Sequence, residues 1–238
     1  LAEQVIVLGI VLASSLECAD GRHPLFSTES ARRSAILVLV RHAGPYMVVF
    51  GIVDDHIHVV VVCSRERAGK LSRAILLGLR PVAGLGFEPS FIKPVESRSH
   101  LLRLVSYCIE QPAKHGLDVH PAMWSGSCVS DLVGARAIEG LELQVGRVLP
   151  RFRSRDAWAA AGLDARGMAP MNEAQVLGVG LTALLDAAAF ATCAAPDLRG
   201  RRRRETMARA AVVTLARRAG YRGVDIASAL GVTPEAVR

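Results

Sequence analysis

Residues 46–63 read YMVVFGIVDDHIHVVVVC, and they carry the strongest indication of the fold. Its two halves are rich in Val and Ile, which favour extended backbone, and only the pair Asp54-Asp55 separates them. A two-residue connection between two such runs is typical of a tight antiparallel hairpin. The stretch therefore predicts strands at 46–53 and 56–63 that lie side by side in one sheet.

The segments on either side of this hairpin complete a mixed α/β domain. Val, Ile and Leu predict a buried strand at 4–13, and an N-cap candidate in Ser27 or Thr28 begins a helix that should run to residue 43. After the hairpin we expect an amphipathic helix at 65–79, an edge strand interrupted by prolines at 87–95, and a helix at 99–110 that ends before Pro112. The order β-α-β-β-α-β is that of a ferredoxin-like (RRM-like) α+β palm, whose antiparallel sheet is covered by helices on one face.

A second, helical domain is expected after the palm. The chain of 238 residues is longer than one typical domain of roughly 100 to 200 residues. Its last third is rich in Ala, Leu and Arg, and helices are predicted at 172–193, 201–219 and 224–230. We therefore expect a palm at 1–136, a connecting region at 137–168, and a helical domain at 169–238 that is truncated at its end.

The composition indicates a folded protein with a polyanionic partner in a reducing compartment. Lys and Arg outnumber Asp and Glu by 29 to 22, and a basic run of Arg199 and Arg201 to Arg204 concentrates this excess. Such a run favours nucleic acid, and a merely solvated surface is the alternative. The five cysteines form no Cys-x-x-Cys pair, which favours the cytoplasm over a disulfide framework or a zinc knuckle. No stretch approaches about 20 uninterrupted apolar residues, so no membrane partner is expected.

His56-Ile57-His58 is the sharpest local feature. Side chains two apart on a strand point to the same face, so both imidazoles project together. Two convergent imidazoles can hold a divalent cation, and a chance pair on a strand is the alternative. Tyr107 and Gln111 lie four positions apart at the end of the last palm helix, hence on one face. Alone, they are as consistent with a core aromatic and a helix-end residue.

These motifs together carry a family resemblance. The segments VDDHIHVVV (53–61), SYCIEQPAKHGL (106–117) and MWSGSC (123–128) resemble transposases of the IS200 type, and most closely their REP-associated tyrosine transposase branch. That family has a His-hydrophobe-His (HUH) strand, then Tyr-x-x-x-(Asn or Gln)-Pro-(basic)-x-Gly-Leu and a Trp-Ser segment. The resemblance covers about residues 4–136. Two departures are Asp54-Asp55 in place of the usual Pro-Asn, and His115 where a small residue is common.

The resemblance implies an enzyme that cleaves and rejoins single-stranded or hairpin DNA through a 5′-phosphotyrosine intermediate. It makes Tyr107 the nucleophile, His56, His58 and Gln111 the ligands of a divalent metal (Mg or Mn), and Lys114 a contact to the DNA backbone. A homodimer is implied as well. The residue types fit this chemistry, because a phenol is a poor nucleophile at neutral pH and a metal can polarise the phosphate that it attacks.

The C-terminal segment predicts a helix-turn-helix. Residues 224–230 are followed by Gly231-Val232 and by Thr233-Pro234, a glycine turn and then an N-cap with proline at the first helical position. This pattern resembles the C-terminal domain of replication initiators, and an ordinary helical hairpin is the alternative. DNA contacts are expected from the basic residues of this domain, Arg201, Arg202, Arg203 and Arg204.

Two other function classes stay open. A non-enzymatic DNA-binding regulator could use the same palm as a scaffold, and an RNA-binding module is suggested by the sheet topology, although the strands lack a Gly-Phe-aromatic signature. Trp124 and Phe91 are expected to pack in the core rather than to stack on bases. The remaining histidines are expected to be surface or structural residues; they are His23, His42, His100, His115 and His120.

Overall fold

The computed structural model describes residues 3–11, 26–83, 87–164 and 172–237. The chain divides into two compact units, the first of residues 1–134 and 140–165, the second of residues 135–139 and 166–238. Residues 140–165, for which the sequence predicted a connecting region, therefore belong to the first unit. Their short helices are α5 (Val145–Val148) and α6 (Ser154–Ala160).

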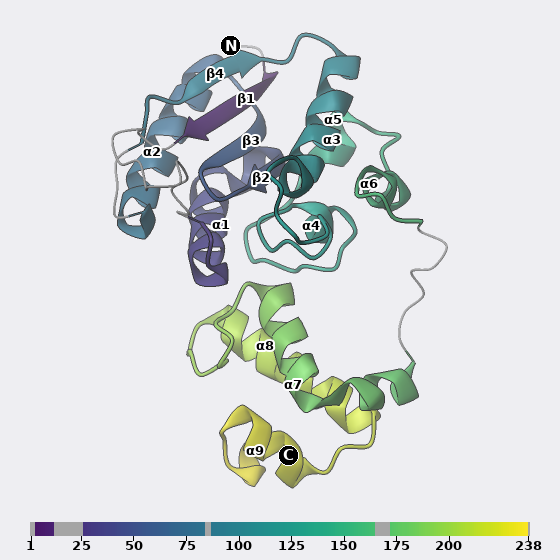
Figure 1. Cartoon of the computed structure of the whole chain (residues 1–238). Coiled ribbons are helices and arrows are strands. Elements are labelled where there is room, and N and C mark those ends of the chain that lie inside the picture. The colour runs from purple at the N-terminus through teal and green to yellow at the C-terminus, as the bar shows by residue number, and fades with distance from the viewer. Residues whose placement is uncertain (1–2, 12–25, 84–86, 165–171, 238) are drawn as a thin grey trace. The chain divides into compact units, whose positions relative to one another are not determined.

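The first unit is a mixed α/β domain, and its elements follow the predicted order. They are β1 (Gln4–Val11), α1 (Glu29–Ala43), the short helix η1 (Gly44–Tyr46), β2 (Met47–Ile52), β3 (His56–Cys63), α2 (Arg65–Ala83) and β4 (Phe91–Pro94). The four strands form one antiparallel sheet in the order β2-β3-β1-β4 (Figure 1). The predicted tight turn at Asp54-Asp55 is confirmed, because the amide of Val53 donates to the carbonyl oxygen of His56 at 3.1 Å. The proline-containing strand β4 lies at an edge of the sheet, as predicted.

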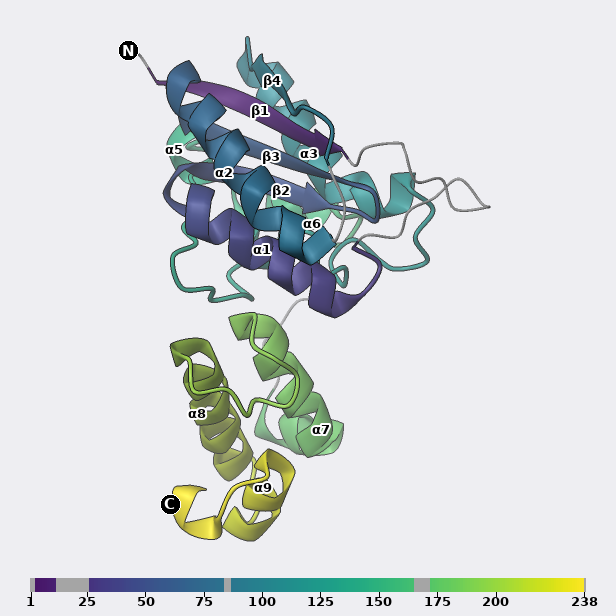
Figure 2. The same ribbon diagram turned by 90° about the vertical axis from the view of Figure 1, so that its left-hand side faces the viewer.

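Helices cover both faces of this sheet, whereas the sequence predicted helices on one face only. Helices α1 and α2 pack against each other on one face, and α3 (Arg98–Lys114) lies on the other (Figure 2). Gly51 of β2 permits this close approach, because a Cβ at that position would lie 2.8 Å from the carbonyl oxygen of Cys108 on α3. Along β3, Ile57 is fully buried, and the histidines on either side of it face α3.

The sequence predicted that helix α3 ends before Pro112. In the structure it continues to Lys114. A proline removes one backbone donor, yet the next turn closes normally here: the amide of His115 donates to the carbonyl oxygen of Gln111 at 3.0 Å. Helix α2 likewise continues past its predicted end and contains Pro81. The start of α1 agrees with prediction, since the Thr28 hydroxyl accepts a hydrogen bond from the amide of Ala31.

Trp124 connects the segment after α3 to the sheet through a hydrogen bond. Its indole N–H donates to the carbonyl oxygen of Ile52 at 2.7 Å, and the guanidinium of Arg32 lies 3.9 Å above its ring. Arg32 also donates to the carbonyl oxygens of Phe26 and Ser27. Trp124 is 7% exposed, which confirms its predicted role in the core. The short helix α4 (Val129–Leu132) follows.

The second unit is helical, with α7 (Glu173–Thr192), α8 (Arg203–Arg218), α9 (Gly223–Leu230) and the short helix η3 (Pro234–Val237). Its core includes Leu184, Val212 and Ile226, one from each of the three long helices. Helix α7 begins with a capping box at Asn172, and Gly180 interrupts it with a φ of 85°. By length and composition α7 could cross a membrane, with a mean hydropathy of 1.6 over its most apolar window. Part of α7 nevertheless packs in the core of this unit.

Candidate active site

His58 of β3 lies in a row of paired residues that crosses the sheet, two positions along the strand from His56. His58 pairs with Gly9 of β1 on one side and with Gly51 of β2 on the other, and Gly9 pairs with Phe91 of β4. A Cβ at Gly9 would lie 1.9 Å from the Phe91 ring. The two glycines therefore leave room beside His58 for an aromatic ring and for the helix. The sequence predicted that Phe91 packs in the core. Its side chain is 39% exposed, and it lies at the edge of this site.

Helix α3 presents Tyr107 and Gln111 to the histidines, because residues four apart share one face of a helix. The ring of Tyr107 meets the ring of His58 edge-on, with 5.1 Å between centroids. The side-chain amide of Gln111 donates to the carbonyl oxygen of Tyr107 at 3.3 Å, which directs its oxygen toward β3. Tyr107 is 36% exposed and Gln111 only 1%, so the phenol is accessible while the carboxamide is buried.

His56 lies between two oxygen atoms. Its Nδ1 is 2.7 Å from a carboxylate oxygen of Asp55, and its Nε2 is 3.0 Å from the carboxamide oxygen of Gln111. A neutral imidazole has one N–H, so in either tautomer one ring nitrogen presents its lone pair to an oxygen acceptor. A cation near Nε2 would remove this conflict, with the N–H directed at Asp55.

This geometry fits a divalent cation. Imidazole nitrogens and a carboxamide oxygen are ligand types that divalent cations accept, and the His56 and Gln111 atoms lie 3.0 Å apart. Asp55 stands where a carboxylate commonly stands behind a metal-bound histidine, on the nitrogen that does not bind the ion.

His58 is held in its neutral form. Burial, and to a smaller extent the neighbouring His56 and His115, lower its pKa to about 4, while Asp55 acts in the opposite direction. At neutral pH its lone pair is therefore available to a metal. Its ring lies 4.8 Å from that of His56 between centroids, in an edge-to-face arrangement.

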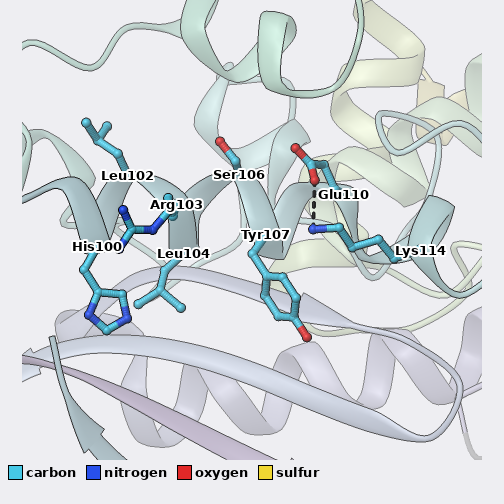
Figure 3. Close-up of a pocket in the computed structure, with 8 residues that line it drawn as sticks. All are labelled: His100, Leu102, Arg103, Leu104, Ser106, Tyr107, Glu110 and Lys114. Atoms are coloured by element: carbon cyan, nitrogen blue, oxygen red, sulfur yellow. Dashed lines mark ion pairs between the residues drawn. The ribbon is translucent and has the colours of Figure 1, made fainter.

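Lys114 lies beside Tyr107, as its spacing on α3 requires. Its ammonium is 4.6 Å from the centre of the tyrosine ring and 2.9 Å from a carboxylate oxygen of Glu110. These residues line a groove of about 610 Å³ along α3, which also includes His100 and Arg103 (Figure 3). In this view Tyr107 projects from the helix toward the sheet.

The structure brings one more titratable residue to this place, which sequence reasoning missed. The ring of His115 lies 4.7 Å from that of His56 between centroids. The sequence grouped His115 with the surface or structural histidines, because no partner was recognised for it at ligand spacing. Its spacing of four from Gln111 was the signal that could have found it.

The four arginines proposed for DNA contacts lie in the second unit, at and before the start of α8. Arg201 and Arg202 are exposed. Arg203 pairs with Glu139 at 2.6 Å, and the partly buried Arg204 pairs with Glu205 at 2.9 Å. The site around His56 and these arginines thus belong to different units.

Comparisons with known proteins give one similar structure. No protein-family model matches the chain, and no curated protein is significantly similar to it. Among solved structures, a REP-associated tyrosine transposase bound to a REP hairpin is similar to this chain, with 18% sequence identity and a TM-score of 0.42. The similarity covers 58% of this chain and 82% of that one.

Proposed function

We propose that this chain is a metal-dependent tyrosine transposase that cleaves and rejoins single-stranded or hairpin DNA. The observation that carries the proposal is the convergence of Tyr107 with His56, His58 and Gln111 on one face of the sheet. An accessible phenol beside a partly buried set of nitrogen and oxygen donors is an arrangement suited to covalent attack on a phosphodiester.

In this reaction the phenolic oxygen of Tyr107 attacks the scissile phosphorus and loses its proton. A bond forms between that oxygen and phosphorus, the bond to the 3′ oxygen breaks, and the 3′ oxygen takes up a proton. The products are a 5′-phosphotyrosine and a free 3′-hydroxyl. Rejoining is the reverse displacement, so the reaction needs no nucleotide cofactor.

The residues around Tyr107 have distinct parts in this scheme. His56, His58 and Gln111 would hold the divalent metal, either Mg²⁺ or Mn²⁺. Such an ion would polarise the scissile phosphoryl oxygen and stabilise the charge on the leaving oxygen. Lys114 is proposed to contact the DNA backbone in the groove along α3.

The rest of the proposal concerns architecture. We propose that the first unit is a ferredoxin-like palm and that α9 and η3 begin a helix-turn-helix in a DNA-binding second unit. The turn supports this reading, since Gly231 has a φ of 62° and Pro234 begins η3. Arg201 and Arg202 would add phosphate contacts. A homodimer that acts in the cytoplasm is part of the same proposal.

The experiment that tests the proposed function is cleavage of a labelled DNA hairpin in the presence of Mn²⁺. The expected products have a free 3′-hydroxyl and a 5′ end that is blocked by protein. Binding of hairpin DNA without any such product, over a library of hairpin sequences, would instead support the non-enzymatic regulator.

A further inference from the structure

A third imidazole lies next to the proposed metal ligands. His115 is half-buried, and ligand atoms of Asp55, His56 and His115 lie within 4.8 Å of one another. His115 is not among the ligands assigned above. The cluster thus joins the turn before β3 to the end of α3.

The fold itself positions His115. Helix α3 continues through Pro112, and the amide of His115 donates to the carbonyl oxygen of Gln111 at 3.0 Å. His115 therefore lies one helical turn after Gln111 and on the same side of α3. Its ring lies 4.7 Å from that of His56 between centroids, at an angle of 60°. A helix end held in this way places an imidazole more reliably than a free loop would.

We propose that His115 is a further ligand of the divalent cation at His56, and that the resulting nitrogen-rich donor set makes the site prefer Mn²⁺ and Zn²⁺ to Mg²⁺. This inference rests on the proposed function for the presence of a cation. Imidazoles from His56, His58 and His115 suit first-row transition metals. Mg²⁺ prefers oxygen ligands and gives up its water reluctantly, so three imidazoles offer it little.

Asp55 supports this arrangement from behind His56. One of its carboxylate oxygens lies 2.7 Å from Nδ1, a position that favours the tautomer in which Nε2 would bind the ion. The side chain of Asp55 is 51% exposed, whereas that of His56 is 12% exposed. Asp55 is accordingly a positioning residue in this proposal, and His115 is the added ligand.

The test is a calorimetric titration of the full chain with Mn²⁺, Zn²⁺ or Mg²⁺ alone, which measures the affinity for each metal. We expect His115→Ala and His115→Asn to bind Mn²⁺ and Zn²⁺ at least about tenfold more weakly than the wild type, since even the loss of an outer-shell partner costs about 10- to 100-fold. Binding of Mg²⁺ should be weak in all variants. His120→Ala is the matched control, because His120 is an exposed histidine near the same end of α3, and it should bind like the wild type.

A second measurement needs no variant. In the wild type labelled with ¹⁵N-histidine, Zn²⁺ should shift one ring nitrogen of His115 as well as those of His56 and His58, and leave His120 unchanged. Unaltered Zn²⁺ affinity in both His115 variants, or an unshifted His115 ring, would overturn the proposal. These outcomes are separate from the proposed function, because a covalent DNA adduct on Tyr107 can form whether or not His115 binds the ion.

Discussion

The carboxamide oxygen of Gln111 lies 3.0 Å from Nε2 of His56, although 55 positions of sequence separate the two residues. The same carboxamide is tied to the backbone of Tyr107 at 3.3 Å. The proposed nucleophile and the proposed metal ligands are therefore connected through one buried side chain. A change on β3 or on α3 is expected to affect both.

The metal assignment predicts the effect of removing both histidines of β3. The double variant His56→Ala/His58→Ala should lose metal-stimulated cleavage of a DNA hairpin. It should keep most of its DNA affinity, because contacts to the DNA phosphates supply most of the binding energy. Cleavage assays with and without Mn²⁺, together with a binding titration, check this. Undiminished metal-stimulated cleavage by the double variant would contradict the assignment.

The close approach of β2 and α3 predicts that Gly51 is needed for the site. A Cβ at this position would lie 2.8 Å from the backbone oxygen of Cys108, so Gly51→Ala should displace α3 or destabilise the fold by about 1–3 kcal/mol. Urea unfolding and Mn²⁺ titration measure the two effects. Gly69→Ala is the control: this glycine lies in α2 with no atom within 4 Å of an added Cβ, so its replacement should be neutral or stabilising by up to about 1 kcal/mol. Equal stability and equal metal affinity in the two variants would contradict the prediction.

The lowered pKa of His58 predicts a pH dependence of stability in the metal-free protein. The folded-state pKa is about 4, below the ordinary 6.5 of an unfolded chain, so between these values the unfolded state binds the extra proton. The free energy of unfolding should therefore fall as the pH drops from about 6.5 to about 4. Urea unfolding with a chelator present, compared between the wild type and His58→Asn, isolates this contribution. An identical pH slope in both proteins would contradict it.

The basic run predicts a salt-dependent contribution to DNA binding. Arg201→Gln/Arg202→Gln should reduce the slope of log affinity against log salt, by about 0.9 for each lost phosphate contact on duplex DNA and about 0.7 on a single strand. Lys70→Gln/Arg73→Gln is the charge-matched control, since both residues are exposed on α2, away from the α3 face of the sheet. A slope that is unchanged by the first pair, or lowered equally by the second, would show that the arginine run only solvates the surface.

Much of the palm could be predicted from sequence because its signals are local. Val and Ile on either side of Asp54-Asp55 specify the hairpin, and the two-residue period of a strand places His56 and His58 on one face. Tyr107 and Gln111 are four positions apart on α3, which likewise places them on one face of the helix.

The rest depended on contacts between distant segments. The position of α3 on the second face of the sheet depends on Gly51, which a local pattern does not relate to Cys108. The rule that proline ends a helix shortened the predicted α3, which was expected to end before Pro112. His115 was assigned to the structural histidines because its sequence neighbours showed no partner at ligand spacing. The role of Asp55 behind His56 required the ring orientation, which only the three-dimensional structure gives.

The most direct test of the account is to locate the covalent DNA adduct. Wild-type protein incubated with a single-stranded hairpin and Mn²⁺ should give a denaturation-resistant adduct, and its peptide map should carry the nucleotide on Tyr107. Tyr107→Phe should bind the same hairpin without forming the adduct, because it lacks only the phenolic oxygen. An adduct in the phenylalanine variant, or attachment at Tyr46 or Tyr221, would contradict the account.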